Sequence, residues 1–394
     1  MTRPAIVVAG LSARMLAESA QRTGGRVIAL DVFGDSDTRR AAARWEPIGD
    51  PATLALDPAR THAALERASV LRGVIGWIAG SGFEACPELL HTGIESLPLI
   101  GNSREAYDAV RSPTNFFALL KECGIAFPET RMERPSNPKG WLCKHSNATG
   151  AWHIRFADAT DACARDDSSG TYYQRICSGR SMSALFLAAG RNATVLGINE
   201  QIVVPNGMHP FLWRGAIGPI PVPPKIEKQV YYAVQTIVAA SGLVGLNSLD
   251  FLSDGEHCIV LEVNARPSAT MALYDYGTRA PLLVQHIRAC RGEPLETLEA
   301  TDRQAPSVHG QLVVFAQGDL TATHAFDAQA RRLGWCHDIP VAGSSIAAGT
   351  PLCTVSAACA PGTSVDAMRA ALTARAAAIE PLLKVSHERS LEYR

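Results

Sequence analysis

The segment "VLEVNARPSATM" (residues 260–271) places an acid, an amide and an arginine within and just after an apolar run. Val260 and Val263 predict a buried β-strand, on which Glu262 and Asn264 share one face because strand side chains alternate. A carboxylate and a carboxamide on a buried strand need polar partners or a bound ion. The segment therefore predicts a binding site at the end of this strand.

A second carboxylate lies on the strand that precedes this one. "SLDFLSDGEHCIVLEVN" (residues 248–264) predicts a hairpin that turns at Asp254. Asp250 faces the same side as Glu262 only if it pairs with an even-numbered residue. A three-residue turn, which pairs residue 253 with 257 and residue 250 with 260, meets this condition, whereas a two-residue Asp-Gly turn does not. We therefore predict the longer turn or a β-bulge.

The oxygen-bearing side chains of this hairpin fit a hard divalent cation. Mg²⁺ takes carboxylate and amide oxygens and completes its shell with water and phosphate oxygens, and Mn²⁺ accepts the same ligands. Zinc would need thiol or imidazole ligands, which the motif lacks. The predicted metal ligands are Asp250, Glu262 and Asn264. Taken alone, Glu262 has a simpler alternative role as a salt-bridge partner of Arg266.

The composition indicates an ordinary folded protein of two or three domains. The chain has 394 residues, of which 47% are apolar and 19% charged, and its net charge of -1 gives no general attraction to nucleic acid or anionic membranes. The ten cysteines form no C-x-x-C pair, which favours buried free thiols in a reducing cytosol over disulfides or a zinc cluster. No apolar segment reaches the roughly 18 residues of a membrane span and no signal peptide is recognisable, so we expect a cytoplasmic protein without a membrane partner.

Three regions follow one another along the chain. Residues 1–110 alternate predicted strands and helices, including a strand in "LPLIGNS" (residues 97–103), which indicates a parallel sheet covered by helices. Residues 111–300 combine hairpins with helices, and residues 301–394 are β-rich with one terminal helix. The first predicted strand is not followed by G-x-G-x-x-G, so the sequence predicts no NAD site.

The hairpin motif "SLDFL…VLEVNARPS" resembles the closing motif of the ATP-grasp superfamily, in which an acid and an E-x-N pair hold Mg²⁺ ions on ATP. The resemblance covers nearly the whole chain. It implies an ATP-grasp fold over residues 111–300, preceded by a Rossmann-like pre-ATP-grasp α/β domain over residues 1–110. It also implies a small β-rich C-terminal module with a terminal helix over residues 301–394, as in ATP-grasp ligases related to biotin carboxylase. The expected fold class is α/β and α+β.

The same resemblance implies which residues bind ATP. Lys144 in "WLCKH" resembles the strand lysine that contacts the phosphates, "SNATGAWHI" resembles the loop that covers them, and "YYQRICSG" resembles the interdomain strand that meets adenine. The sequence departs from the family pattern in three ways: the loop has one glycine, Arg175 replaces a common acid, and Arg111 is the nearest match to a common helical lysine. The implied ATP-binding residues are Lys144, Asn147, Thr149, Gly150, Gln174, Arg175 and Ile176.

The resemblance also implies a ligase that makes an acyl phosphate from ATP and a carboxylate, which an amine then attacks. Lys144 and Arg266 are the implied catalytic cations, since they would stabilise the transferred phosphoryl group. The chain is similar to the tyramine–glutamate ligases of methanofuran-type and methylofuran-type cofactor biosynthesis, which implies tyramine and the γ-carboxylate of glutamate as substrates. The alternatives are the same chemistry on other substrates, a carboxylase-like enzyme, or a nucleotide-binding protein without catalysis.

Substrate contacts are expected outside the metal motif as well. "AGSGFE" (residues 79–84) follows a predicted strand, where open α/β sheets bind ligands, although a tight turn is an equal alternative. Arg214, in an aromatic and proline-rich segment expected to be a loop, is suited to a substrate carboxylate or is a plain surface arginine. Tyr274 either lines an acceptor pocket or packs. The substrate candidates are Ser81, Glu84, Arg214, Arg266, Ser268 and Tyr274. The expected partners are small-molecule carboxylates and amines, and a homodimer is compatible with the sequence.

Overall fold

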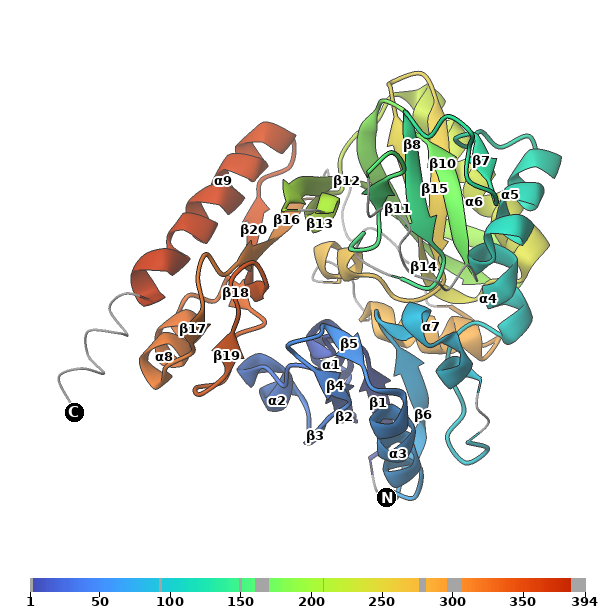
Figure 1. The fold of residues 1–394 in the computed structure, drawn as a ribbon. Coiled ribbons are helices and arrows are strands. Elements are labelled where there is room, and N and C mark those ends of the chain that lie inside the picture. Colours follow the sequence, from blue (N-terminus) through green and yellow to red (C-terminus); the bar gives the residue numbers. More distant parts are fainter. Residues whose placement is uncertain are drawn as a thin grey trace.

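The computed structural model describes residues 3–91, 94–148, 151–159, 170–207, 209–275, 281–295 and 307–383 (Figure 1). The N-terminal region forms a four-stranded parallel sheet with strand order β3-β2-β1-β6, as the alternating pattern predicts. Its strands are β1 (Ala5–Ala9), β2 (Arg26–Asp31), β3 (Arg44–Pro47) and β6 (Val74–Ala79), and its helices are α1 (Arg14–Gln21), α2 (Ser36–Ala41) and α3 (Pro58–Ser69). Shorter elements are β4 (Gly49–Asp50), β5 (Ala55–Leu56), η1 (Phe83–Ala85) and η2 (Pro87–Leu90).

The strand predicted in residues 97–103 is wrong in extent. Only Leu99 forms a β-bridge, to Trp77 of strand β6. Pro98 has no N–H with which to extend the ladder, so pairing stops after one bridge. The chain then enters two helices, α4 (Arg104–Arg111) and α5 (Pro113–Glu122).

A small antiparallel sheet follows these helices. Its strand order is β7-β10-β8-β9, with β7 (Thr130–Arg131), β8 (Trp141–His145), β9 (Arg155–Phe156) and β10 (Thr171–Arg175). The strand pattern of "WLCKH" and "TYYQR" is thereby confirmed. Strands β8 and β10 carry Lys144 and Gln174 to the same place, because Lys144 pairs with Tyr172 in the ladder and its Nζ donates to Gln174 Oε1 at 3.1 Å.

The largest element is an eight-stranded antiparallel sheet of order β15-β14-β11-β12-β13-β16-β20-β18. Its first five strands in chain order are β11 (Arg180–Ala189), β12 (Asn192–Asn206), β13 (His209–Gly218), β14 (Gly245–Ser253) and β15 (Cys258–Asn264). Helix α6 (Pro224–Ser241) packs on this sheet through Val230, Val234 and Ile237, which recur every three or four residues and are fully buried. The helix ends at Gly242, whose φ of 73° suits a glycine C-cap, as expected for such a sequence. Downstream of the hairpin are η3 (Ala269–Leu273) and α7 (Leu282–Cys290).

The C-terminal residues continue the same sheet. Strand β16 (Val308–Phe315) pairs with β13 and with β20 (Pro351–Cys359), and β20 pairs with β18 (Cys336–His337). Strands β17 (Leu320–Thr321) and β19 (Ser345–Ile346) form a separate pair, and α9 (Val365–Ala377) packs on β16 and β20. In Figure 1 the red and orange C-terminal elements lie beside the blue N-terminal ones. None of the helices in the described ranges is long and apolar enough to cross a membrane.

Helix α8 (His324–Arg332) was not expected, because only one C-terminal helix was predicted. The side chain of Thr323 accepts the backbone N–H of Phe326 at 3.1 Å and so begins the helix. Phe326 and Ala330, four residues apart, are fully buried. One capping residue and one apolar pair therefore stabilise the helix, and this pattern is too short to be recognised in the sequence.

Asn102 fixes the β14–β15 hairpin at the edge of the eight-stranded sheet to the N-terminal region. Its Nδ2 donates to Asn247 Oδ1 and to the carbonyl of Ala265, both at 2.9 Å, and its Oδ1 accepts the Val244 N–H at 2.7 Å. Asn102 is 6% exposed, so these groups cannot turn to water instead. This amide therefore helps to set where the hairpin lies.

Asn102→Ala is expected to lower the free energy of unfolding by about 3 kcal/mol, because it breaks three buried hydrogen bonds of about 1 kcal/mol each. Urea denaturation measures this difference. Asn137→Ala is the matched control: Asn137 is exposed and accepts one local N–H, from Lys139, so the expected change is below about 0.5 kcal/mol. Equal effects of the two substitutions would contradict the role assigned to Asn102.

Candidate active site

The β14–β15 hairpin brings the predicted metal ligands to one face. Asp250 pairs with Glu262 and Ser248 pairs with Asn264. The register shifts between Asp250 and Phe251, which pairs with Val260, so residue 261 is an extra residue on β15. The even-numbered pairing that the metal site requires is therefore met through a β-bulge, one of the two predicted routes.

The alternative prediction, a three-residue turn, is wrong. Ser253 pairs with Cys258 rather than with residue 257, and Asp250 does not pair with residue 260. The cause is the Asp254 side chain, whose Oδ1 accepts the backbone N–H groups of Glu256 and His257 at 2.8 and 2.7 Å. These bonds hold residues 254–257 together as a longer turn.

The donor set of this face fits Mg²⁺. Asn264 Nδ2 donates to Asp250 Oδ2 at 3.2 Å, so these two side chains meet beside Glu262. Burial, and then the neighbouring carboxylate of Glu262, raise the pKa of Asp250 to about 7. A buried carboxylate pair of this kind needs added positive charge, and its oxygens are the ligands that a hard cation prefers. Asp250, Glu262 and Asn264 would hold the ion.

Two cations already lie beside Glu262. Burial alone would raise the pKa of Glu262, but Arg111 and then Lys144 hold it below its usual value. Arg111, the last residue of α4, places Nη1 3.4 Å from Glu262 Oε2 and donates from Nη2 to the carbonyl of Ser146 at 2.7 Å. The side chain of Glu262 is 34% exposed and that of Arg111 only 9%. Glu262 can therefore contact a ligand in the cavity, while the buried Arg111 holds the Glu262 carboxylate through their ion pair. The sequence singled out Arg111 only as the nearest cation and did not include it among the site residues.

Arg266 is held by an acid from the N-terminal region. Its Nε lies 2.6 Å from Glu84 Oε1, and its Nη2 donates to Asn264 Oδ1 at 3.4 Å. Glu84 is a substrate candidate by sequence, but its side chain is only 5% exposed and is directed to Arg266 and to the Gly82 N–H. In the structure Glu84 therefore orients Arg266, whereas Ser81 of the same turn lines the cavity.

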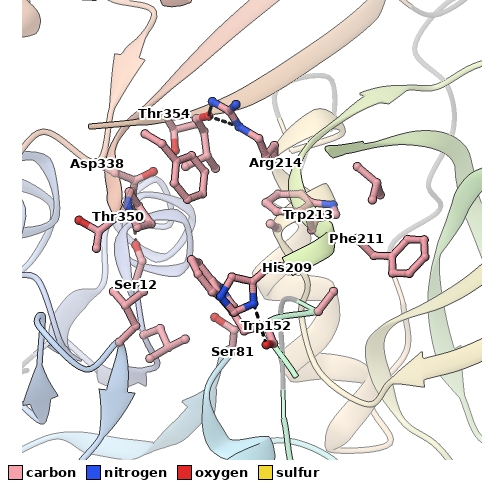
Figure 2. A pocket seen from close by; sticks show the side chains of 18 of the residues that line it. Ser12, Ser81, Trp152, His209, Phe211, Trp213, Arg214, Asp338, Thr350 and Thr354 are labelled. Atoms are coloured by element: carbon pink, nitrogen blue, oxygen red, sulfur yellow. Dashed lines mark hydrogen bonds between the residues drawn. The ribbon is translucent and has the colours of Figure 1, made fainter. Parts of the chain in front are cut away.

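One cavity of about 3020 Å³ gathers most of the predicted site residues. It is lined both by the metal-binding face and by side chains of the N- and C-terminal regions, and Figure 2 shows part of its wall. Thr149 and Gly150 lie outside the described residues. The predicted residues that line the cavity are Ser81, Lys144, Asn147, Gln174, Arg175, Ile176, Arg214, Asp250, Glu262, Asn264, Arg266 and Ser268.

Two substrate candidates differ from expectation. Arg214 lies on strand β13 rather than in a loop, and its Nε and Nη2 donate to the carbonyl of Val313 at 3.2 and 2.9 Å. Its guanidinium also stacks 4.8 Å from the centre of the Phe315 ring. Tyr274 is not among the cavity-lining residues: its hydroxyl donates to Asn199 Oδ1 and its ring fills space beside Gly197, which supports the packing alternative.

Sequence reasoning missed an aromatic wall of the cavity. Every second residue of β13 from His209 to Trp213, including Phe211, lines the cavity. Trp152 packs edge-on to His209, with 4.6 Å between the centres of the two rings (Figure 2). The signal was present as aromatic residues at every second position. His153, a further lining residue, carries a buried Nδ1 without a partner in the described residues, and burial lowers its pKa to about 4.

Comparison with known proteins identifies the fold and one matching domain. Residues 114–270 match the family model of an ATP-grasp domain, and the chain has the ATP-grasp fold with a Rossmann-like parallel sheet before it, as predicted. The match to the ATP-grasp family model thus concerns residues 114–270, and the likeness over the rest of the chain is one of fold. Comparison of the sequence with curated proteins gives no match.

Solved structures similar to this chain share its fold at low sequence identity. L-amino acid ligase from Bacillus licheniformis has 16% identity and a TM-score of 0.69, covering 95% of this chain and 97% of that one. Biotin carboxylase from Campylobacter jejuni has 12% identity and a TM-score of 0.67, covering 90% and 87%. N5-carboxyaminoimidazole ribonucleotide synthetase from Thermus thermophilus has 16% identity and a TM-score of 0.63, covering 93% and 96%. At such identities the likeness concerns the fold alone.

Asp250→Asn should change how stability depends on pH. The pKa of Asp250 is about 7 in the folded protein against 3.8 ordinarily, so its contribution is fully present below pH of about 4 and is lost as the pH rises through about 7. The variant should lack this loss and melt higher than the wild type at neutral pH without Mg²⁺. Added Mg²⁺ should raise the melting temperature of the wild type more than that of the variant. Thermal denaturation across pH, with and without MgCl₂, measures both.

Asp254→Asn is the matched control on the same hairpin. Hydrogen bonds from His257 and from the backbone lower the pKa of Asp254 to about 2, so its stabilisation is present above pH of about 4 and is lost as the pH falls through about 2. This substitution should therefore lower, not raise, stability at neutral pH. If both substitutions shifted the melting temperature at neutral pH in the same direction, the opposite pKa shifts assigned to Asp250 and Asp254 would be contradicted.

Proposed function

We propose that this protein is an ATP-dependent carboxylate–amine ligase that forms an amide through an acyl phosphate. The observation that carries this proposal is the convergence of Asp250, Glu262 and Asn264 with Lys144 and Arg266 on one cavity. This is a phosphate-binding arrangement of acids for a metal ion and of fixed cations. The remainder of the cavity leaves room for two further substrates beside ATP.

The chemistry balances as two displacements. A carboxylate oxygen attacks the γ-phosphorus of ATP, and the bond from that phosphorus to the bridging oxygen breaks to release ADP. The amine nitrogen then attacks the acyl carbon, the C–O bond to phosphate breaks, and the nitrogen loses a proton. Mg²⁺, when bound, neutralises charge on the phosphate oxygens.

Residues of this chain would supply the remaining positive charge. Lys144, which is only 5% exposed, has its Nζ fixed by Gln174, so its position costs little to organise on binding. Arg266 is fixed by Glu84 in the same way. We assign both to the transferred phosphoryl group, with Asn147 at the phosphates and residues 174–176 at adenine.

For the substrates we propose tyramine and the γ-carboxylate of glutamate, as in methylofuran-type cofactor biosynthesis. The support is the overall resemblance of the sequence to tyramine–glutamate ligases, together with the aromatic wall at Trp152 and Trp213, which suits a phenol ring. Arg214, cavity-lining and half-buried, suits the α-carboxylate of glutamate. The alternative of a carboxylase-like enzyme draws support from the likeness to biotin carboxylase structures, one of which is a complex with MgADP and bicarbonate.

The test is release of ADP from Mg-ATP across a matrix of carboxylates and amines that includes glutamate, tyramine and bicarbonate, with products weighed by mass spectrometry. Release that requires both glutamate and tyramine, with a product of the condensed mass, is the expected result. Release with bicarbonate alone would favour the carboxylase-like alternative. Measurable ATP binding without ADP release from any pair would favour a non-catalytic nucleotide-binding protein.

Glu262→Gln should lower kcat by about 100- to 1000-fold, because it removes a charge from the proposed metal site without changing its shape. Glu256→Gln is the matched control, since Glu256 lies in the turn of the same hairpin, is exposed, and forms its one ion pair within the described residues with exposed Lys225. The control should turn over like the wild type, and both variants should keep the wild-type circular dichroism spectrum. Unchanged turnover in Glu262→Gln would refute the metal site.

A further inference from the structure

The cavity has an acidic end where the N-terminal and C-terminal regions meet. Asp35 and Ser12 from the N-terminal region and Asp338 from the C-terminal region line the same cavity as Arg266. Figure 2 shows Ser12 and Asp338 on one side of this space and Trp213 on the other. The phosphate-binding function proposed above uses none of these acids.

Asp35 is a buried carboxylate without a partner in the described part of the chain. The residue is 6% exposed and sits at the N-cap of α2, yet its side chain bonds no backbone N–H of that helix. Burial, and then the charges of Asp338 and Asp31, raise its pKa well above its usual value. A largely buried carboxylate is costly when it has no direct hydrogen bond or ion pair and Arg14 acts on it only from beyond ion-pair distance, and here its open side is the cavity.

Arg14 is the cation that offsets these acids, and it already forms direct ion pairs with Asp338 and Glu18. Arg14 places Nε 2.8 Å from Asp338 Oδ1 and Nη1 2.9 Å from Glu18 Oε2. The carboxylate of Asp37 accepts two consecutive backbone N–H groups of the C-terminal region, at 2.8 and 3.2 Å. Asp35 has neither kind of contact, and Arg14 offsets its charge only from a distance while it pairs directly with Asp338 and Glu18.

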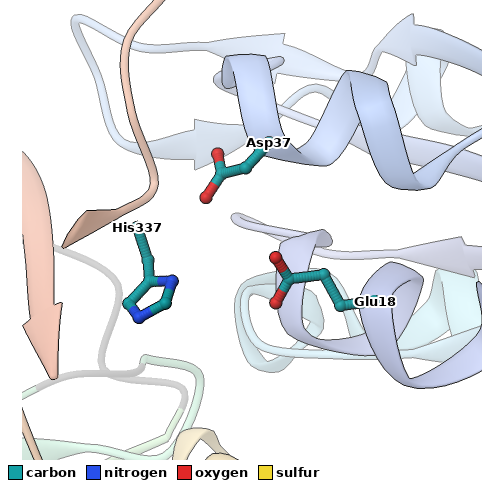
Figure 3. A group of neighbouring side chains, drawn as sticks. All are labelled: Glu18, Asp37 and His337. Atoms are coloured by element: carbon teal, nitrogen blue, oxygen red, sulfur yellow. The ribbon is translucent and has the colours of Figure 1, made fainter. Parts of the chain in front are cut away.

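Three neighbouring side chains could be taken for a metal site that provides positive charge to Asp35, but their two acids are already paired with Arg14. Glu18, Asp37 and His337 point toward one another with ligand atoms within 4.8 Å (Figure 3). Arg14 lies against this group, 2.9 Å from Glu18 and 3.7 Å from Asp37. Its guanidinium repels a metal ion and already gives these acids a counter-charge. The group therefore belongs to the contact between the two regions.

We propose that Asp35, with Asp338 beside it, binds a protonated amino group of a substrate whose apolar part lies toward Trp152 and Trp213. An ammonium supplies both the positive charge and the N–H donors that the Asp35 carboxylate lacks. Asp338 adopts a φ of 52°, a costly conformation for a non-glycine residue, and its side chain is fixed by Arg14 and Ser12. The carboxylate is thus held in place at the cavity wall.

This inference rests on the proposed ligase function and narrows its substrates. The attacking amine must be unprotonated, so an ammonium held between carboxylates is not the nucleophile. It is a second nitrogen that keeps its charge through the reaction and remains in the product. The substrate class is therefore an amino acid or a diamine, and the α-ammonium of glutamate is one such group.

Asp35→Asn removes the charge and keeps the shape. The free variant should melt a few degrees above the wild type, because an uncompensated buried carboxylate is gone. Asp50→Asn controls for net charge: Asp50 lines the same cavity but is exposed and already accepts the Ala52 N–H at 2.9 Å, so no shift is expected. A lower melting temperature for Asp35→Asn would give its carboxylate a structural role and overturn the proposal.

Binding is measured by calorimetry on the full chain with Mg²⁺ and a non-hydrolysable ATP analogue. The probes are pairs that differ by an amino group that is not the nucleophile: L-glutamate and glutarate, and L-phenylalanine and 3-phenylpropionate. The wild type should bind the amino member of at least one pair about tenfold more tightly, and Asp35→Asn should bind both members alike. No preference in the wild type for any pair, or a preference that survives in Asp35→Asn, overturns the proposal.

ADP release separates this proposal from the ligase function. Loss of the amino preference in Asp35→Asn, without ADP release from any substrate pair, would retain the ammonium site and reject the ligase. ADP release from a substrate pair, together with an amino preference that Asp35→Asn keeps, would reject the ammonium site alone.

Discussion

The site depends on one extra residue in strand β15. Without the bulge at residue 261, the pairing of Ser253 with Cys258 would set Asp250 opposite Leu261 and turn Glu262 to the other face of the sheet. With it, two carboxylates face each other across the ladder, and burial, and then the charge of Glu262, raise the pKa of Asp250. A β-bulge is a common way to re-aim a side chain beside a site, and here it brings the proposed metal ligands to one face of the sheet.

The repulsion within that pair explains why distant parts of the chain meet at the hairpin. Arg111 comes from α4 and bridges Glu262 to the carbonyl of Ser146, and Arg266 is aligned by Glu84, which follows strand β6. Each guanidinium contacts one group of the hairpin and one group outside it. The charge balance of the site and the docking of the regions are therefore the same set of contacts. Any substitution that alters one must alter the other, and for this reason stability and binding have to be measured together.

Local sequence pattern predicted the parts of the fold that are local. The alternation in residues 248–264 predicted the hairpin, and the expected metal site then required a longer turn or a bulge that puts Asp250 and Glu262 on one face; the strand around Lys144 also followed from its pattern. The pattern could not choose between a turn and a bulge, because the choice rests on the Asp254 side chain capturing two backbone N–H groups. The sequence pattern could not show that Glu84 orients Arg266, since the two residues are 182 positions apart in the chain. Tyr274 packs rather than lining the cavity because Gly197 leaves room for its ring, a match between segments that no periodicity encodes.

Asp250 and Asp35 share a physical property although they lie on different elements. Both are buried carboxylates whose pKa is raised, and both line the cavity. A folded chain retains such groups at a cost in stability, and a ligand that brings positive charge removes the cost only in the bound state. If a metal ion satisfies the first and an ammonium group satisfies the second, the free protein is destabilised at two points of one cavity. Binding of the metal and binding of the amino substrate would then each stabilise the protein at its own point of the cavity.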